Sequence, residues 1–229
     1  IGAAILAMPI TTGFIGFLPS IPLFIACHLL YLASAFCFLD VCLSIPGKTN
    51  IISMADKTLG IKGKIFAWIV YLLLLYCIQA AYMDGCSQLF QEFIKAIFNY
   101  DISQKFTCVL LPLIFGIFIY SGTQAVDKIN RIMMLGLSVS YILLVYYLPQ
   151  HIETENLLHI DLKPLFFALP VVAVAFGYHI VIPSLVSYCQ RNRKDLIKIL
   201  VIGSFLPLVI NVIFQFLAIG VLPIRGELS

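Results

Sequence analysis

The sequence predicts an all-α polytopic membrane protein, and three observations carry this prediction. Hydrophobic residues make up 62% of the 229 residues and charged residues only 11%, whereas soluble domains are about half apolar and about a quarter charged. The mean hydropathy is +1.05. Six apolar stretches stand out, and a spanning helix needs about 20 residues to cross a hydrocarbon core of roughly 30 Å. They cover residues 1–39, 65–90, 106–120, 132–148, 164–188 and 199–223.

The first stretch is long enough for two helices. FLPSIP, residues 17–22, holds two prolines and a serine, so we expect a turn there that splits the stretch. This gives about seven transmembrane segments, the first of which, residues 1–18, lacks its beginning. Because the sequence opens at Ile1 inside an apolar run and not at a methionine, we expect it to be part of a longer protein.

The basic residues lie mainly on one side of the predicted spans. Loops 48–64, 121–131 and 189–198 carry ten of the 14 Lys and Arg residues, and the loops of the other side carry four. Cytoplasmic loops are enriched in Lys and Arg, so we place the first set in the cytoplasm. We read residues 48–64 as a polar cytoplasmic loop.

Several functional classes are disfavoured. A net charge of +3 without a basic run gives no sign of nucleic-acid binding. The seven cysteines form no CxxC pair, so we read them as small buried apolar residues and expect neither metal nor cofactor. The sequence contains no GxSxG and no HExxH, which argues against an intramembrane enzyme, and no repeat suggests a channel filter.

Two segments carry helix-breaking residues in matching places. IGAAILAMP puts Gly2 before Pro9, and AFGYHIVIP puts Gly177 before Pro183. Proline removes a backbone donor and glycine permits unusual torsions, so both weaken a helix. The two segments are the first and the sixth. Interrupted segments at corresponding positions of two halves indicate a five-plus-five inverted-repeat transporter with discontinuous first and sixth helices.

Such breaks would suit a zwitterionic amino acid. The N-terminus of a half-helix offers N–H groups to a carboxylate, and unwound carbonyls accept hydrogen bonds from an ammonium group. We therefore expect one incomplete membrane domain over residues 1–229. Its first repeat covers residues 1–148, and its second repeat begins at residues 164–223.

Four motifs, IGAAILAMP, AAYMDG, VDKINR and FGYHIVIPSLVSY, resemble the bacterial tryptophan/tyrosine permeases. These are aromatic amino acid permeases of the amino acid–polyamine–organocation superfamily, and the tyrosine-specific members are the most similar. The resemblance covers essentially the whole chain. It implies the five-plus-five fold, eleven spans of which this chain supplies seven, and proton-coupled uptake. The family motif Gly-Ala-Gly is replaced by Gly2-Ala3-Ala4, and Ala4 does not adopt a positive φ cheaply.

The resemblance and the dipole argument together assign candidate substrate-binding residues. The backbone of the first break would bind the substrate carboxylate, unless the true break lies upstream. Carbonyls of the second break would face the ammonium group, and one of its aromatic rings would stack on the substrate or else serve in packing. Tyr82 on the third segment would offer its hydroxyl if that helix tilts. The candidates are Gly2, Ala3, Ala4, Ile5, Tyr82, Phe176, Gly177 and Tyr178.

Two residues are candidates for proton coupling. His179 is an ionisable side chain at membrane depth that titrates near physiological pH. Its alternative role is that of a neutral imidazole bonded to the broken backbone. Asp84 is the second candidate, and its alternative is a solvated carboxylate near the external end of its span.

We therefore expect a secondary active transporter that imports an aromatic amino acid, with tyrosine favoured. Coupling would be by proton symport across the bacterial cytoplasmic (inner) membrane. Its partners would be the substrate, the coupling proton and the lipid bilayer, and we expect a monomer. Transport of tryptophan or a small neutral amino acid is the alternative, as is a truncated, non-functional remnant.

Overall fold

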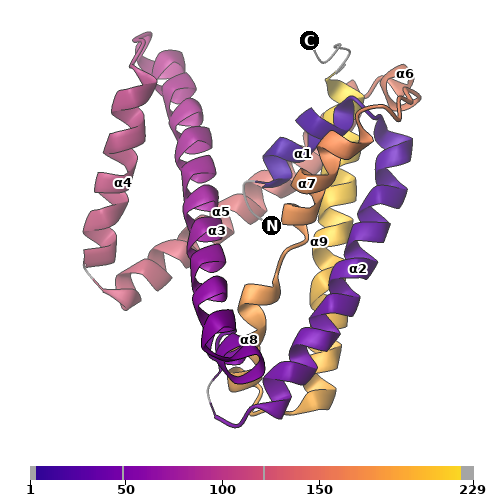
Figure 1. The fold of residues 1–229 in the computed structure, drawn as a ribbon. Helices are drawn as coiled ribbons and strands as arrows, with labels where there is room; N and C mark the ends of the chain where they lie inside the picture. The colour runs from indigo at the N-terminus through magenta and orange to yellow at the C-terminus, as the bar shows by residue number, and fades with distance from the viewer. Residues whose placement is uncertain (1–3, 48, 121, 223–229) are drawn as a thin grey trace. The chain divides into compact units, whose positions relative to one another are not determined.

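The computed structural model describes residues 4–47, 49–120 and 122–222, and every regular element in these ranges is a helix (Figure 1). Five helices are long and apolar enough to cross a membrane, with a shorter apolar helix at Gln104–Ile117. The long helices span Phe17–Ser44, Ile51–Phe98, Gln124–His151, Leu165–Tyr188 and Arg193–Val221. The prediction of an all-α, multi-pass membrane protein is thereby confirmed, and the count of seven spans stays a prediction.

The chain forms two compact units. The first unit comprises Ile1–Trp68 with Val145–Ser229, and the second comprises Ile69–Leu144. The first holds α1 (Ala4–Gly13), α2 (Phe17–Ser44), the start of α3 (Ile51–Phe98), η1 (Leu148–His151), α6 (Thr154–Leu157), α7 (Leu165–Ala175), η2 (His179–Val181), α8 (Ile182–Tyr188) and α9 (Arg193–Val221). The second holds the rest of α3, α4 (Gln104–Tyr120) and most of α5 (Thr123–Tyr147).

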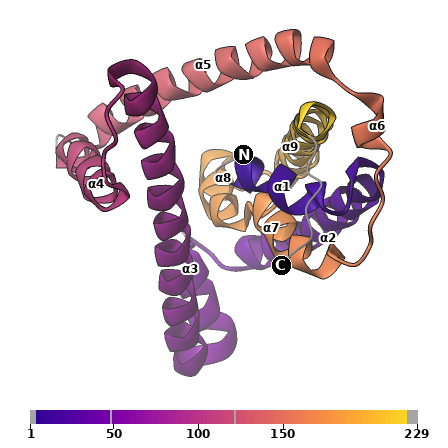
Figure 2. The same cartoon turned by 90° about the horizontal axis from the view of Figure 1, so that it is seen from above.

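In the first unit, α2 and α9 run side by side, α1 packs on α7 and α9, and α8 packs on α2 (Figures 1 and 2). Two buried apolar clusters hold these helices together. One is formed by Met8, Phe24, Val172, Phe176 and Leu208. The other is formed by Ala35, Leu39, Cys42, Ile45, Met54, Ile182, Val186, Leu196 and Leu200. Each of the half-helices α7 and α8 is therefore anchored in its own cluster.

The turn between α1 and α2 lies earlier than we predicted. The chain turns at residues 14–16, and FLPSIP forms the first turns of α2, so the prediction of a turn at 17–22 is wrong. Gly16 supplies the turn with a φ of +99°. Pro19 falls within the first turn of α2, where an N–H group has no intrahelical partner and its loss breaks no bond.

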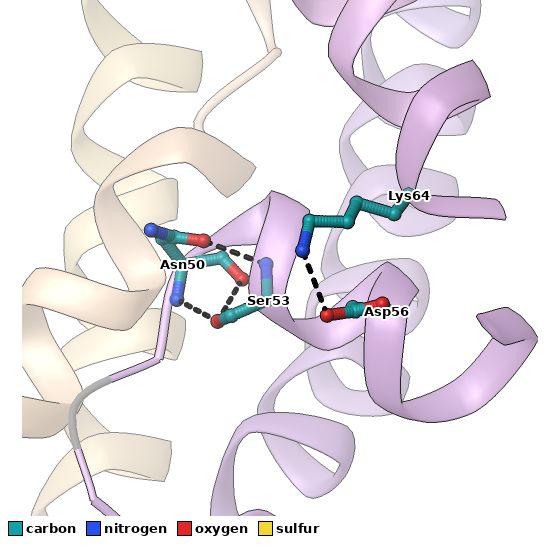
Figure 3. A network of polar contacts seen from close by, with 4 residues as sticks. All are labelled: Asn50, Ser53, Asp56 and Lys64. Atoms are coloured by element: carbon teal, nitrogen blue, oxygen red, sulfur yellow. Dashed lines mark hydrogen bonds and ion pairs between the residues drawn. The ribbon is translucent and has the colours of Figure 1, made fainter. Parts of the chain in front are cut away.

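The segment expected to be a polar loop at 48–64 is largely helical (Figure 3). Its start is capped reciprocally, because Ser53 N donates to Asn50 Oδ1 (2.7 Å) and Asn50 N donates to Ser53 Oγ (2.9 Å). The helix kinks at Gly60, which has φ 70° and ψ −167°. Lys64 Nζ lies 3.0 Å from Asp56 Oδ2, so this ion pair joins the residues on the two sides of the kink.

Candidate functional site at the interruption between α7 and α8

The sixth predicted segment is interrupted at residues 176–178, between the end of α7 and the start of η2 (Figure 1). The Phe176 N–H is shared by the carbonyls of Val172 and Ala173, both at 3.3 Å, and the Gly177 N–H reaches the Val174 carbonyl at 3.1 Å. The α-helical ladder thus tightens to a 3₁₀-type pattern and stops.

Gly177 sits where the backbone is crowded by its own helix end. A Cβ at this position would lie 3.3 Å from the Val174 carbonyl oxygen and 3.8 Å from Cε1 of Tyr31. The residue itself is exposed. A side chain would therefore press on a carbonyl of the break, whereas glycine leaves the backbone open.

Phe176 is turned into the interior of the first unit. It is 3% exposed and belongs to the apolar cluster around Met8, and its ring centroid lies 6.1 Å from Phe24 and 6.2 Å from His28. In this conformation its ring packs against α2.

His179 is surrounded by three aromatic rings and one hydroxyl. Its ring stacks on Tyr178, with centroids 5.5 Å apart and an interplanar angle of 20°. The rings of Tyr31 and Phe38 approach it edge-on at 5.6 and 5.8 Å. Its Nε2 lies 3.2 Å from Ser34 Oγ. The imidazole is therefore held by α2 and keeps a polar partner at one nitrogen.

The Tyr178 hydroxyl points toward α9, whereas the His179 ring contacts α2. It is buried beside the Ser204 hydroxyl without forming a regular hydrogen bond with it. The two residues that follow Gly177 thus contact α9 and α2 respectively, and the break lies between these two helices.

The candidates of the first segment lie at the start of α1. Gly2 and Ala3 fall outside the described residues, Ala4 is the first residue of α1, and Ile5 follows in its first turn, partly buried. Pro9 does not end the helix, which continues to Gly13. A break in the first segment, and a half-helix N-terminus there, stay predictions, because the residues before Ala4 lie outside the described ranges.

Tyr82 and Asp84 lie on α3 in the second unit, whereas the break belongs to the first. Asp84 Oδ1 accepts a hydrogen bond from Gln104 Nε2 at 2.7 Å, and Oδ2 accepts one from Gln88 Nε2 at 2.9 Å. Its carboxylate therefore links α3 to α4 on an exposed surface. The Tyr82 side chain is 39% exposed.

The sequence reasoning missed a buried polar face on α9. Ser204, Asn211 and Gln215 are all nearly inaccessible to solvent. Gln215 Nε2 donates to Thr12 Oγ1 of α1, and Thr12 Oγ1 donates to the Met8 carbonyl at 2.6 Å. Their spacing places these residues on one side of a helix, so the pattern was readable in the seventh segment.

No group of three or more His, Cys, Asp or Glu side chains gathers within the part of the chain that the structure describes. The break is instead lined by backbone groups, aromatic rings, one imidazole and neutral polar side chains.

Comparison with known proteins decides the family. Residues 1–228 match the model of the tryptophan/tyrosine permease family. The chain belongs to this family. The resemblance seen in the four sequence motifs is thus confirmed, and the family is one of permeases and not of enzymes.

Curated relatives of this permease chain carry names for different amino acids. It is 32% identical to "Tyrosine-specific transport system 1" of Haemophilus influenzae, over 97% of this chain and 55% of that protein. It is 28% identical to "Tryptophan-specific transport protein" of the same organism, covering 97% and 56% of the two chains. It is also 28% identical to "Glutamine transporter 2" of Aliivibrio fischeri, covering 96% and 58%.

The chain therefore spans little more than half the length of these relatives. No solved structure matches it significantly.

Proposed function

We propose that the full-length permease is a secondary active transporter that imports an aromatic amino acid, with tyrosine preferred, by proton symport across the bacterial cytoplasmic membrane. The observation that carries this proposal is the interruption at residues 176–178, which opens a backbone segment between α2 and α9 in a permease-family chain. Irregular backbone at membrane depth is tolerated where it is buried in protein or lines a cavity.

The substrate would be held by its two charged groups at two helix ends. The ammonium group donates to carbonyls around Phe176 and Gly177, where the regular ladder stops. The carboxylate accepts from N–H groups of Ala4 and Ile5 at the start of α1, together with Gly2 and Ala3. Support comes from packing, because Met8, one turn after Ala4, belongs to the same cluster as Phe176.

The aromatic ring of the substrate would contact a ring of the protein. Tyr178 is the better placed of the two residues at the break, because Phe176 is committed to the apolar cluster. Offset and edge-to-face arrangements of such rings contribute about 0.5–1.5 kcal/mol beyond the buried area. Tyr82 of α3 stays a candidate for contributing a hydroxyl to substrate binding.

The coupling proton would bind His179. Its Nε2 meets the Ser34 hydroxyl, which can either donate to or accept from the ring, so this contact suits both protonation states. Asp84 is the second candidate, held by two amide donors on the exposed side of α3. The two candidates lie in different units and can be tested separately.

Uptake by the full-length protein in proteoliposomes tests this function. Radiolabelled tyrosine, tryptophan and phenylalanine are offered under an inward proton gradient and, separately, under a sodium gradient. We expect tyrosine uptake that follows the proton gradient. Uptake of none of the three amino acids refutes the aromatic assignment, and uptake that follows only sodium refutes the proton coupling.

Glutamine is a second candidate substrate, since a relative is named for glutamine transport. Adding glutamine to the same assay separates the two readings: a glutamine transporter accumulates glutamine and leaves tyrosine outside. We take the protein to act as a monomer, which its mass in detergent would test.

A further inference from the structure

One face of α9 is polar and buried although α9 is long and apolar enough to cross the membrane. Ser204, Leu208, Asn211 and Gln215 follow one another at helical spacing and are 6%, 9%, 2% and 0% exposed. We call them the α9 row. Residues at this spacing share one side of a helix. Polar groups inside a span are expensive and need a reason to be there.

Along α9, the row first lies beside the residues of the break and then reaches α1. Ser204 lies beside Tyr178, and Leu208 packs in the cluster that contains Phe176. Gln215 bonds to Thr12 near the end of α1. Asn211 therefore lies between the level of the break and the contact with Thr12. α9 runs beside α2 and contacts α1 (Figures 1 and 2).

The orientation of the Gln215 amide follows from its partner. Thr12 donates its hydroxyl proton to the Met8 carbonyl, so it must accept from Gln215, and the amide nitrogen of Gln215 faces it. The Oε1 atom of Gln215 is then left buried without a partner, and so is the Oδ1 atom of Asn211. A carboxamide oxygen only accepts hydrogen bonds, so both atoms call for a donor.

We infer that Asn211, supported by Gln215, determines substrate specificity by accepting a hydrogen bond from the ring donor of the substrate. This inference rests on the proposed function. The ammonium group of the substrate is assigned to the C-terminal end of α7, and its carboxylate to the N-terminal end of α1. The hydrogen-bond donor that remains is the phenol hydroxyl in tyrosine and the indole N–H in tryptophan. Phenylalanine has no such donor.

The position of Asn211 suits this role. Leu208 packs in the same cluster as Phe176. Asn211 comes three residues later, about 4.5 Å farther along the helix axis. Asn211 is preferred over Gln215 as the direct acceptor because Gln215 is already held by Thr12. A site built to bond a hydroxyl discriminates strongly against an analogue that lacks it, because its buried acceptor is then left unpaired.

The first test uses the unaltered full-length protein in proteoliposomes. Unlabelled tyrosine and unlabelled 4-fluorophenylalanine are compared as inhibitors of the uptake of labelled tyrosine. The fluorinated compound has a similar shape but no hydrogen-bond donor on its ring. We expect tyrosine to be preferred by about tenfold or more. Equal competition by the two compounds would overturn the inference without touching the proposed function.

The second test compares two substitutions at the same position. Asn211→Leu removes the acceptor at similar volume, and we expect the preference for tyrosine over 4-fluorophenylalanine to fall to near unity while uptake of the fluorinated compound persists. Asn211→Asp keeps an acceptor and should retain the preference. For a variant that binds but does not transport, the preference is measured instead from the shift of the melting temperature that each compound induces.

Three results separate the explanations. An unchanged preference in Asn211→Leu shows that the α9 row is a packing contact, and the inference fails. If Asn211→Leu takes up both compounds equally poorly and has a lower melting temperature, the α9 row is likewise a packing contact and the inference fails. If the unaltered protein takes up no aromatic amino acid at all, the proposed function fails, and this inference fails with it.

Discussion

The Nε2 atom of His179 lies 3.2 Å from the hydroxyl oxygen of Ser34, so a single polar contact joins the interrupted segment to α2. The rest of the imidazole is enclosed by the rings of Tyr31, Phe38 and Tyr178. A serine hydroxyl is both donor and acceptor, so it pairs with a neutral ring and with a charged one. The contact can therefore form in both protonation states of the ring.

His179→Gln in the full-length protein is expected to lower gradient-driven uptake by about tenfold or more, because glutamine does not titrate near neutral pH. Exchange of labelled for unlabelled substrate without a gradient should continue. Ser34→Ala is the companion variant and should reduce uptake less, since the ring keeps its three aromatic neighbours. Undiminished proton-driven uptake by His179→Gln would remove this residue from the mechanism.

Asp84→Asn separates the second coupling candidate from the first. Asp84 accepts hydrogen bonds from Gln88 and Gln104 on an exposed surface, and asparagine keeps one acceptor oxygen. We expect the variant to retain its dependence on the proton gradient and to be less stable by about 1 kcal/mol at most. Uptake that no longer responds to the gradient would move the coupling role from His179 to Asp84.

Arg191 caps the C-terminal end of α2 and should matter for stability. Its guanidinium donates to the carbonyls of Cys42, Leu43, Ile45 and Gly47 at 2.7–3.3 Å. Arg191→Ala leaves these carbonyls without a charged donor, and we expect the free energy of unfolding to fall by about 1.5–3 kcal/mol. Thermal unfolding in detergent measures the change.

Arg193→Ala is the matched control for Arg191→Ala. Arg193 pairs with Asp40 at 3.0 Å, but both side chains are more than half exposed, so the expected change is about 0–1 kcal/mol. Arg191→Lys should recover little stability, because lysine lacks the planar fork that reaches several carbonyls. Equal effects of the two alanine substitutions would contradict the capping role.

Gly16→Ala should be strongly destabilising. Gly16 has a φ of +99°, and a Cβ there would collide with the backbone carbonyl of His159. A non-glycine residue in such a conformation costs of order 1–3 kcal/mol, and the collision adds to this. Gly203→Ala on α9 is the control, because no atom lies within 4 Å of its Cβ position and alanine favours the helix. Similar melting temperatures of the two variants would refute the argument.

The bond between Thr12 and Gln215 joins α1 to α9, and Thr12→Val removes it. The buried amide nitrogen of Gln215 is then unpaired, so we expect a loss of about 1–3 kcal/mol. Thr11→Val is the control, since the Thr11 hydroxyl bonds only to carbonyls of its own helix. Adding Gln215→Leu to Thr12→Val should recover part of the loss, and strictly additive effects would show that the two residues do not interact.

The sequence predicted those features that depend on neighbouring residues. Hydropathy predicted an all-helical, multi-pass membrane protein, and Gly177 with Pro183 located the interruption at residues 176–178. Both follow from the chemistry of a short stretch: an apolar run needs lipid or packing, and glycine and proline weaken a helix wherever they occur.

Other local predictions failed because two local signals competed. FLPSIP was read as a turn, but prolines are also tolerated at a helix start, and Gly16 was the residue able to make the turn. Residues 48–64 were read as a loop from their polarity, but the reciprocal bonds of Asn50 and Ser53 start a helix there. In each case the sequence allowed both readings.

What the sequence by itself determined is the class of protein, its family motifs and the place where the sixth segment comes apart. The tertiary structure alone decided where the side chains lie: Phe176 is turned into the core, His179 contacts Ser34, and Gln215 of α9 bonds to Thr12 of α1. The physical reason is how far apart along the chain the interacting residues lie. Helix formation and breaking depend on residues a few positions apart, whereas these contacts join helices more than a hundred residues apart, and packing between those helices selects them.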